Sequence, residues 1–169
     1  IEDRIIMENL EEIRGWTKDT IEYFHLGWNK TEKRIWIPVF SNNEDGVELI
    51  TTLKKYDVFK ITTGPKYLFL SDSITDTIFP STNSLFEDEV WLMAGEGDTI
   101  LARQLGLNSI CLTTGEGSLF PKRLIPDMTR KSLYICYDCD TAGEEGRGKI
   151  IDQLEGICKE IYVATFTKK

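Results

Sequence analysis

The alternation of apolar and polar residues changes character about halfway along the chain. In the first half, apolar residues recur at helical spacing over residues 3–14, and Gly15 ends this run. Thr17 is a suitable N-cap for a second short helix, which we expect to end near His25. Two strand-like runs then flank the turn-rich sequence NNEDG and predict a hairpin with a longer loop; they cover residues 34–40 and 47–53.

Beyond Glu89, short apolar strands alternate with helical segments. The predicted strands cover residues 90–93, 109–112, 133–137 and 161–166, and the predicted helices cover residues 98–105 and 141–157. This alternation is typical of an α/β fold in which helices cover both faces of a parallel sheet. Serine, threonine, aspartate and proline dominate residues 71–88. We therefore predict a small α+β subdomain over residues 1–85 and an α/β domain over residues 86–169.

Composition restricts the classes of protein to consider. The chain has 169 residues, of which 41% are hydrophobic and 28% charged, which is typical of one or two folded modules and excludes a disordered tail. No apolar run exceeds five residues, far short of the roughly 20 needed to cross a bilayer, so we exclude a membrane protein. The chain starts with Ile1 and lacks the features of a signal peptide. We expect a piece of a larger cytoplasmic protein.

The cysteines predict no metal or disulfide framework. Four cysteines and one histidine are too few and too unevenly spaced for either. Cys136 and Cys139 form a C-x-x-C pair, but positions three apart on a strand point to opposite faces. We therefore expect reduced thiols with structural roles.

Charge is unevenly distributed along the chain. The net charge of −8 at first argues against a nucleic-acid partner, because phosphate binding depends on lysine and arginine. Residues 30–66, however, carry seven bases against five acids, so the remainder of the chain is strongly anionic. A clustered anionic region is either a solvated surface or a metal site whose carboxylates are neutralised by divalent ions.

Two acidic clusters follow predicted strands. Asp138 and Asp140 come directly after the apolar run 133–137, and Glu96 and Asp98 follow the first strand of the α/β half. Ligands of open α/β sheets lie beyond the carboxyl ends of the strands, so the two clusters can converge on one Mg²⁺ or Mn²⁺ site. The alternative is that Asp98 and Asp140 only cap the helices that follow them.

The α/β half also contains two glycine-rich stretches. Gly115-Glu116-Gly117 follows a predicted strand and is typical of a tight turn. Residues 143–149 read GEEGRGK and satisfy G-x-x-x-x-G-K, but a P-loop next needs Ser or Thr to hold Mg²⁺, which Ile150 cannot do. We favour a buried helix face here over an ATP-binding loop.

Taken in order, these motifs resemble the Toprim-containing catalytic core of bacterial DnaG-type primases and phage primase-helicases. The stretch from Ala94 to Gly106 is similar to the family's E-G-x-x-D turn and the helix after it, and Asp138 to Gly143 resembles its D-x-D-x-A-G. Further motifs follow in the family's order: Arg14-Gly15, Ile21 to Trp28 (IEYFHLGW), Arg34 to Pro38 (RIWIP), Gly64 to Leu68 (GPKYL) and Phe79 to Phe86. The resemblance covers most of the chain and implies an α+β subdomain followed by a C-terminally truncated Toprim domain.

The resemblance implies a metal-dependent active site. Asp138 and Asp140 would bind catalytic Mg²⁺ or Mn²⁺, and Asp98 would support them as a catalytic acid. The chemistry would be two-metal phosphoryl transfer, in which the protein mainly positions groups and supplies electrostatics.

The resemblance also implies a surface for nucleic acid and nucleotide. Its residues would be Arg34, Lys54, Lys55, Lys66, Tyr67 and Gly115. The expected partners are a single-stranded DNA template, nucleoside triphosphates and a replicative helicase domain or subunit. The expected location is the cytoplasm of a bacterium or a phage-infected cell.

The main departure from the family pattern is at Ala94, where the catalytic glutamate of the family would fall. A methyl group neither binds a metal ion nor acts as a base. Three possibilities stay open: an engineered Glu-to-Ala substitution, a natural loss of activity, or takeover by Glu96 as the catalytic and metal-binding acid. In addition, Ser81 stands where the family has a base, and a third acidic motif would lie beyond Phe166.

Three functions follow from this pattern. The first is a primase core that copies single-stranded DNA into short RNA primers, in active or inactivated form. The second is an inactive Toprim-like module that binds nucleic acid or nucleotide. The third is a fragment of a Toprim nuclease or topoisomerase, in which the Arg34 and Lys66 motifs are not expected.

Overall fold

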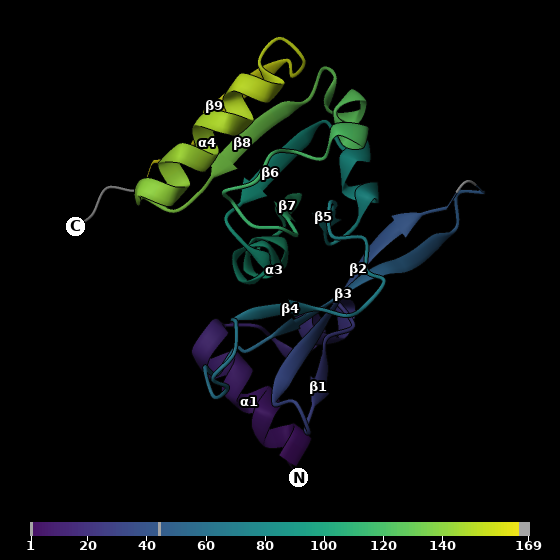
Figure 1. The fold of residues 1–169 in the computed structure, drawn as a ribbon, viewed down its shortest axis with the longest axis vertical. Coiled ribbons are helices and arrows are strands. Elements are labelled where there is room, and N and C mark those ends of the chain that lie inside the picture. Colours follow the sequence, from purple (N-terminus) through teal and green to yellow (C-terminus); the bar gives the residue numbers. More distant parts are fainter. Residues whose placement is uncertain (1, 44, 166–169) are drawn as a thin grey trace. The chain divides into compact units, whose positions relative to one another are not determined.

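The structure, a computed structural model, describes residues 2–43 and 45–165. The chain forms two compact units, residues 1–75 (unit 1) and 76–169 (unit 2), whose elements are labelled in Figure 1. The predicted boundary lay after residue 85, ten residues later. The difference arises because β5 (Ile78–Phe79) pairs antiparallel with β7 (Ser109–Leu112), so the residues after 75 belong to the second sheet.

Unit 1 contains two helices and an antiparallel sheet. The helices are α1 (Glu2–Arg14) and α2 (Lys18–Tyr23), and Thr17 caps α2 by accepting a hydrogen bond from the Thr20 N–H, as predicted. The strand order is β1-β2-β3-β4, with bounds Gly27–Asn29, Arg34–Asn42, Glu48–Tyr56 and Tyr67–Phe69. The predicted hairpin is β2 and β3, and the short strands β1 and β4 extend it on either side.

The core of unit 1 follows the alternation of β2. Ile35, Ile37 and Val39 are at most 1% exposed, as is Leu10 of α1. Successive strand residues point to opposite faces, so the residues between them belong to the other face of the sheet. That face carries Trp36, which lies opposite Lys55 of β3.

Unit 2 is built around a five-stranded sheet with the order β5-β7-β6-β8-β9. Strands β6 (Glu89–Met93), β8 (Ser132–Cys136) and β9 (Glu160–Val163) run parallel to one another and to β7, and β9 forms one edge of the sheet. Helix α3 (Glu96–Gln104) follows β6 and α4 (Thr141–Leu154) follows β8. Three short 3₁₀ helices complete the unit: η1 (Thr82–Phe86), η2 (Lys122–Leu124) and η3 (Pro126–Met128). The predicted α/β architecture with a parallel sheet is confirmed, with β5 as an added antiparallel edge.

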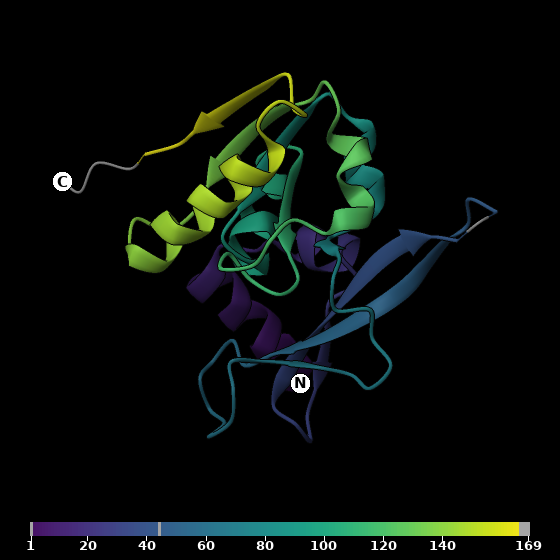
Figure 2. The same cartoon turned by 45° about the horizontal axis from the view of Figure 1, so that its top comes forward.

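The apolar core of unit 2 lies on one face of this sheet. Val90, Leu92, Leu133 and Ile135 are fully buried together with Ile150 and Leu154 of α4. Figure 2 shows α4 lying along the sheet, with β9 at the outer edge. This packing fixes the carboxyl ends of the strands relative to the start of α4.

Two findings bear on the predicted class of protein. Within the part of the chain that the structure describes, no helix combines the length and hydrophobicity needed to cross a membrane. All four cysteines lie within the described residues, and none of them forms a disulfide bond. Cys111 and Cys136 are buried, whereas Cys139 is exposed.

Candidate functional site

The carboxyl ends of β6, β7 and β8 meet at one edge of the sheet. β7 and β8 both pair with β6 and run parallel to it. Ala94 follows β6, Glu116 lies in the loop after β7, and Asp138 follows β8. Side chains at this edge are held by rigid strands, and ligands of open parallel sheets bind there. We call the region the acidic edge, after Asp98, Glu116, Asp138 and Asp140.

Glu116 connects the strand ends of the acidic edge. Its Oε2 atom accepts a hydrogen bond from the backbone N–H of Asp138 at an N···O distance of 3.3 Å. Burial raises the pKa of Glu116, and the negative charges of Asp138, Asp140 and Asp98 raise it further, against the hydrogen bond from Asp138, which lowers it. The aspartates that follow β6 and β8 therefore lie near enough for their negative charges to act on Glu116.

The first turns of α4 press against the loops of the acidic edge. A Cβ atom at Gly143 would lie 2.1 Å from the carbonyl oxygen of Asp138, and one at Gly146 would lie 2.0 Å from that of Glu116. Only glycine permits so close an approach of a helix to these backbones. Lys149 donates a hydrogen bond of 2.8 Å to a carbonyl of the Glu116 loop. Packing against the acidic edge thus accounts for Gly143 and Gly146 of the GEEGRGK sequence, in agreement with the predicted buried helix face.

The aspartates differ in their local roles. Asp140 is the N-cap of α4, and its Oδ1 atom accepts a hydrogen bond of 2.9 Å from the N–H of Gly143. One of the two carboxylate oxygen atoms of Asp140 is therefore used to cap the helix. Asp98 lies in the first turn of α3, whose N-cap is Gly95, so Asp98 is not the cap of that helix. Asp98 and Asp138 are both exposed to solvent.

Two residues near the end of β6 are enclosed by protein. Ala94, at the position of the expected glutamate, is partly buried and packs against the apolar core of unit 2. Glu96 is only 1% exposed in the first turn of α3. Glu116, by contrast, is partly exposed. Glu116 is not among the residues predicted for the site, although its position after a third parallel strand is the signal that could have identified it.

The acidic edge is not a complete metal cage. No three Asp, Glu, His or Cys side chains among the described residues are arranged to hold a metal ion by themselves. Mg²⁺ does not require such a cage, because it keeps several waters and binds through one or two carboxylates together with substrate phosphates. Glu116 and Asp138 are neighbouring carboxylate residues of this kind. Burial is the main cause of the raised pKa of Glu116, and a divalent cation would relieve the smaller contribution from the neighbouring aspartates. The donors therefore fit Mg²⁺ or Mn²⁺ that is held jointly with a phosphate group.

Gly115 turns the chain into the acidic edge. Its φ of +92° lies in the left-handed region that glycine adopts readily, and its N–H bonds to the carbonyl of Leu112 at 3.0 Å. The turn directs the chain from the end of β7 to Glu116. A direct contact of Gly115 with nucleotide stays a prediction.

In unit 1, Arg34 supports the loop that carries Lys66. Arg34 is only 4% exposed. Its guanidinium donates hydrogen bonds to the Thr62 hydroxyl at 2.7 Å and to the carbonyl oxygens of Pro65 and Lys66 at 2.8 and 3.2 Å. Because its donors are used within the protein, Arg34 shapes the loop in this structure instead of presenting its charge to solvent.

Asp57 closes the same loop. Its Oδ1 atom accepts a hydrogen bond from the Ile61 N–H at 2.9 Å, and its Oδ2 atom accepts from the N–H and the hydroxyl of Thr62 at 2.8 and 2.6 Å. Burial by itself would raise the pKa of Asp57, but the hydrogen bonds from Thr62 and Ile61 and the positive charge of Arg34 outweigh it and lower the pKa. The loop between β3 and β4 is thus held by one buried anion and one buried cation.

Lys66 is the exposed base of this loop and lies over aromatic rings. Its ammonium is 5.3 Å from the ring centroid of Tyr67 and 5.6 Å from that of Tyr56. The two rings stack with their centroids 4.7 Å apart. The Arg14 guanidinium also contacts this pair of rings: it lies 5.4 Å from the centroid of the Tyr56 ring and donates a hydrogen bond to the Tyr56 hydroxyl. These contacts are cation–π interactions, which hold a charged group in place without neutralising it.

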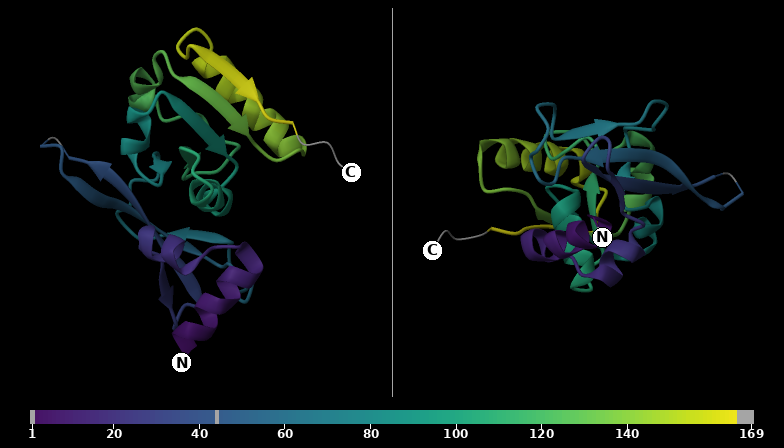
Figure 3. Two further views of the ribbon diagram at one scale, coloured as in Figure 1. Left: turned by 180° about the vertical axis from the view of Figure 1, so that it is seen from behind. Right: turned by 90° about the horizontal axis from the view of Figure 1, so that it is seen from below.

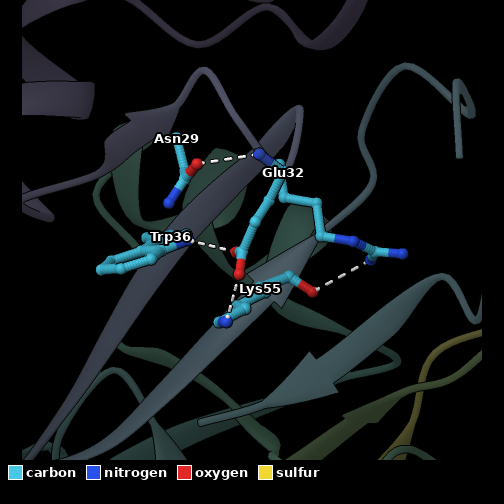
Figure 4. A network of polar contacts seen from close by, with 5 residues as sticks. Asn29, Glu32, Trp36 and Lys55 are labelled. Atoms are coloured by element: carbon cyan, nitrogen blue, oxygen red, sulfur yellow. Dashed lines mark hydrogen bonds and ion pairs between the residues drawn. The ribbon is translucent and has the colours of Figure 1, made fainter.

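The other two predicted bases are engaged within the protein. Lys54 is 3% exposed, and its ammonium lies 4.2 Å from the Tyr67 ring. Lys55 forms an ion pair of 2.7 Å with Glu32, as Figure 4 shows, and this hydrogen bond lowers the pKa of Glu32. The same carboxylate also accepts a hydrogen bond of 3.2 Å from the Trp36 indole. Of the four bases predicted for this surface, Lys66 is the exposed one.

Comparison with known proteins identifies the fold. No protein-family model and no curated protein matches the chain. Among solved structures, the zinc-binding and RNA polymerase domains of the Aquifex aeolicus primase match 95% of the chain with a TM-score of 0.73 and 16% identity. The catalytic core of DnaG matches 94% with a TM-score of 0.63 and 15% identity. The primase fragment of the bacteriophage T7 primase-helicase matches 92% with a TM-score of 0.59 and 15% identity.

These matches establish the fold and not the activity, because the identities are low. The chain has the fold of a DnaG-type primase core, so the resemblance that its motifs suggest is confirmed at the level of the fold. The chain spans 49% of the A. aeolicus structure, 65% of the DnaG core and 64% of the T7 fragment.

Proposed function

We propose that this chain is the RNA-polymerising core of a DNA primase, of the type found in phage or mobile-element primase-helicases. The observation that carries the proposal is the convergence of Asp98, Glu116 and Asp138 at the carboxyl ends of three parallel strands in a chain with a primase-core fold. The proposed substrates are nucleoside triphosphates, copied on a single-stranded DNA template. The proposed partner is a replicative helicase domain or subunit.

The acidic edge would form the chemical centre of this Toprim domain. Glu116 and Asp138 would hold Mg²⁺ or Mn²⁺ together with the phosphates of the nucleotide, and Asp98 would add negative charge beside them. The bound ion would lower the pKa of the primer hydroxyl and stabilise charge on the triphosphate. The glycine contacts of α4 would keep these carboxylates in place before the substrate arrives.

Unit 1 would supply the contact with phosphate groups. Lys66 is exposed and held by two aromatic rings, which suits a cation that meets a phosphate without a large loss of side-chain entropy. Arg34 and Asp57 would act as positioning residues, because they hold the loop and do not face solvent. Tyr67 would contribute its ring to the same surface.

A binding module without catalytic activity is the second candidate, and the residues at the end of β6 favour it. Ala94 has no functional group, and the Glu96 carboxylate is buried. The acidic edge would then hold a nucleotide and its metal ion without supplying the acid that the reaction needs. The two candidates agree on metal binding and differ in turnover.

Calorimetry with Mn²⁺ tests the part that both candidates share. We expect Asp138→Asn to lower the Mn²⁺ affinity in the presence of a nucleoside triphosphate by about tenfold or more, which corresponds to about 1.4 kcal/mol. Asp152→Asn is the matched control, because Asp152 is an exposed aspartate in α4 outside the acidic edge. Equal affinities for the two variants would contradict a metal site at the acidic edge.

Primer synthesis separates the two candidates. The assay measures incorporation of labelled ribonucleotides on a single-stranded template by the parent chain and by Ala94→Glu. We expect Ala94→Glu to make more product than the parent, because it restores a carboxylate at the end of β6. Absence of product from both proteins, with Mn²⁺ and template binding intact, would favour the binding module. Strand nicking without incorporation would indicate a nuclease or topoisomerase fragment instead.

A further inference from the structure

The loop that carries Glu116 is fixed at both of its ends by contacts within unit 2. This Glu116 loop, residues 113–121, joins β7 to η2. At its start, the N–H and the hydroxyl of Thr113 both donate hydrogen bonds to the Thr77 carbonyl, at 3.1 and 3.0 Å. Near its end, Phe120 is 1% exposed and belongs to the apolar core of unit 2. Glu116 lies between these two fixed points.

One face of α4 supports the Glu116 loop. Gly146, Lys149 and Gln153 follow one another at intervals of three and four residues, so they lie on the same side of the helix. Gly146 is where the helix approaches the Glu116 carbonyl, and the Lys149 ammonium donates its hydrogen bond of 2.8 Å to the Gly117 carbonyl. Figure 3 (left) shows this helix running along the sheet behind β8 and β9. The loop is therefore attached to a rigid element of the fold.

Gln153 makes the most complete of these contacts. Its Oε1 atom accepts a hydrogen bond from the Phe120 N–H, and its Nε2 atom donates one to the Phe120 carbonyl, both at 2.8 Å. A side-chain amide contains both a donor and an acceptor, so it can pair with the two polar backbone groups of one residue as a neighbouring strand would. Neither lysine nor an ionised glutamate offers both kinds of group. We call these two hydrogen bonds the Gln153 clamp.

Pairing of a buried backbone would by itself account for the Gln153 clamp, but the contacts of α4 indicate a further role. Gly143 approaches the Asp138 carbonyl in the same way as Gly146 approaches the Glu116 carbonyl. One rigid helix therefore contacts the backbones of both acids that would share a cation. The negative charge of Asp138 disfavours the charged form of Glu116. With no cation bound, an unattached loop would carry Glu116 away from Asp138.

We propose that Gln153 is a positioning residue, which holds Glu116 at the distance from Asp138 that one divalent cation requires. This inference rests on the proposed function of the acidic edge and adds to it a residue outside the motifs that resemble those of primases. The Gln153 clamp acts through the backbone of the loop, and Lys149 assists it at Gly117. The Glu116 carboxylate then needs little rearrangement when the ion arrives.

A double-mutant cycle with Glu116→Gln tests this role. Gln153→Met keeps the length of the side chain and removes both hydrogen bonds to Phe120. We expect it to lower the Mn²⁺ affinity in the presence of a nucleoside triphosphate, measured by calorimetry, by about tenfold. In the Glu116→Gln background the same substitution should cause no further loss, because the group that it positions is absent. Gln104→Met is the matched control, since Gln104 is a partly buried glutamine at the C-terminal end of α3.

Hydrogen exchange of the amides in residues 113–121, followed by mass spectrometry of the whole chain, gives a readout that needs no metal. We expect exchange in the Glu116 loop to be faster in Gln153→Met than in the parent and in Gln104→Met. Gln153→Glu keeps the shape of the side chain and the bond from the Phe120 N–H. It should give an intermediate rate, and it replaces Gln153→Met if that variant does not fold.

The outcomes separate this role from the proposed function. Equal losses of affinity in the two backgrounds would show that Gln153 supports the fold in general and not Glu116, and would overturn the inference. Exchange rates or affinities of Gln153→Met that match those of Gln104→Met would also overturn it. Absence of Mn²⁺ binding to the parent, or no loss of affinity in Glu116→Gln alone, would contradict the metal site itself and the positioning role with it, whatever the exchange rates.

Discussion

The burial and pairing of single residues determine which charged side chains of this molecule are accessible to a ligand. Glu116 is acted on by the negative charges of nearby aspartates and remains partly exposed, whereas Glu96 is buried in the first turn of α3. Arg34 is also buried, yet its guanidinium donates hydrogen bonds to three groups of one loop. Residue type alone does not distinguish a group that meets a ligand from one that shapes the backbone around it.

Asp57 makes the stability of unit 1 dependent on pH. Its folded-state pKa is lowered below the ordinary value, about 3.9. Asp57 therefore contributes stability that is fully present above that value and is lost as the pH falls through the folded-state pKa. We expect the free energy of unfolding, followed by tryptophan fluorescence in urea, to fall between pH 6 and pH 3 more steeply for the parent than for Asp57→Asn.

The same variant has a second expected effect at neutral pH. An amide at position 57 turns one acceptor into a donor that faces an N–H, which costs about 1–3 kcal/mol. Asp45→Asn is the control, because Asp45 is exposed in the turn between β2 and β3. Parallel pH profiles for the parent and Asp57→Asn would show that the buried carboxylate does not stabilise the loop.

Among the elements, α4 links the sheet to the acidic edge. Its glycines fall into two kinds, because Gly143 and Gly146 meet backbone atoms of the neighbouring loops, whereas Gly148 faces open space. A helix with this composition is weak on its own, since glycine disfavours helix formation. Its place in the fold therefore depends on tertiary contacts made by the two close-packed glycines.

Paired substitutions in α4 should have effects of opposite sign. Gly146→Ala places a methyl group 2.0 Å from the Glu116 carbonyl oxygen, so helix and loop must separate, at a cost of about 1–3 kcal/mol. Gly148→Ala meets no atom within 4 Å and should stabilise the helix by about 0.5–1 kcal/mol. Chemical denaturation measures both changes. Stabilisation by both variants would show that α4 does not press against the Glu116 loop.

Across the whole molecule, the available positive charge is smaller than the sequence suggests. Residues 30–66 carry seven bases, but Arg34 and Lys54 are buried and Lys55 is paired with Glu32. The four remaining bases are exposed: Lys30, Lys33, Lys60 and Lys66. The basic segment, residues 30–66, therefore offers four exposed bases for contact with phosphates, in a chain whose net charge is −8.

The salt dependence of single-stranded DNA binding should reflect the small number of exposed bases in this segment. Each phosphate neutralised on a single strand contributes about −0.7 to the slope of log K against log salt, so four contacts predict a slope no steeper than about −3. Anisotropy of a labelled oligo-dT at several salt concentrations measures the slope, and Lys66→Gln should make it shallower by about 0.7. Lys18→Gln removes the same charge from an exposed site on α2. An equal change of slope in both variants would show that the slope depends on the net charge of the chain and not on a contact between Lys66 and a phosphate.

Local patterns in the sequence determined much of this molecule. The strands and helices of the α/β half, the hairpin of unit 1 and the caps at Thr17 and Asp140 depend on residues within a few positions of one another. The motifs that resemble those of primases follow one another in the family's order, so the fold class was predictable as well. A buried helix face could be favoured over a P-loop at residues 143–149 because Ile150 does not suit a P-loop.

The tertiary structure alone decided which charged groups are available. The pairing of Glu116 with Asp138 joins positions 22 residues apart, and the bond from Arg34 to Pro65 joins positions 31 apart. The short strands β1, β4 and β5 are likewise defined only by distant partners. Burial of Glu96 and Lys54 has the same origin. Whether a charge is buried, paired or exposed depends on what packs against it, and the residues adjacent in sequence do not contain that information.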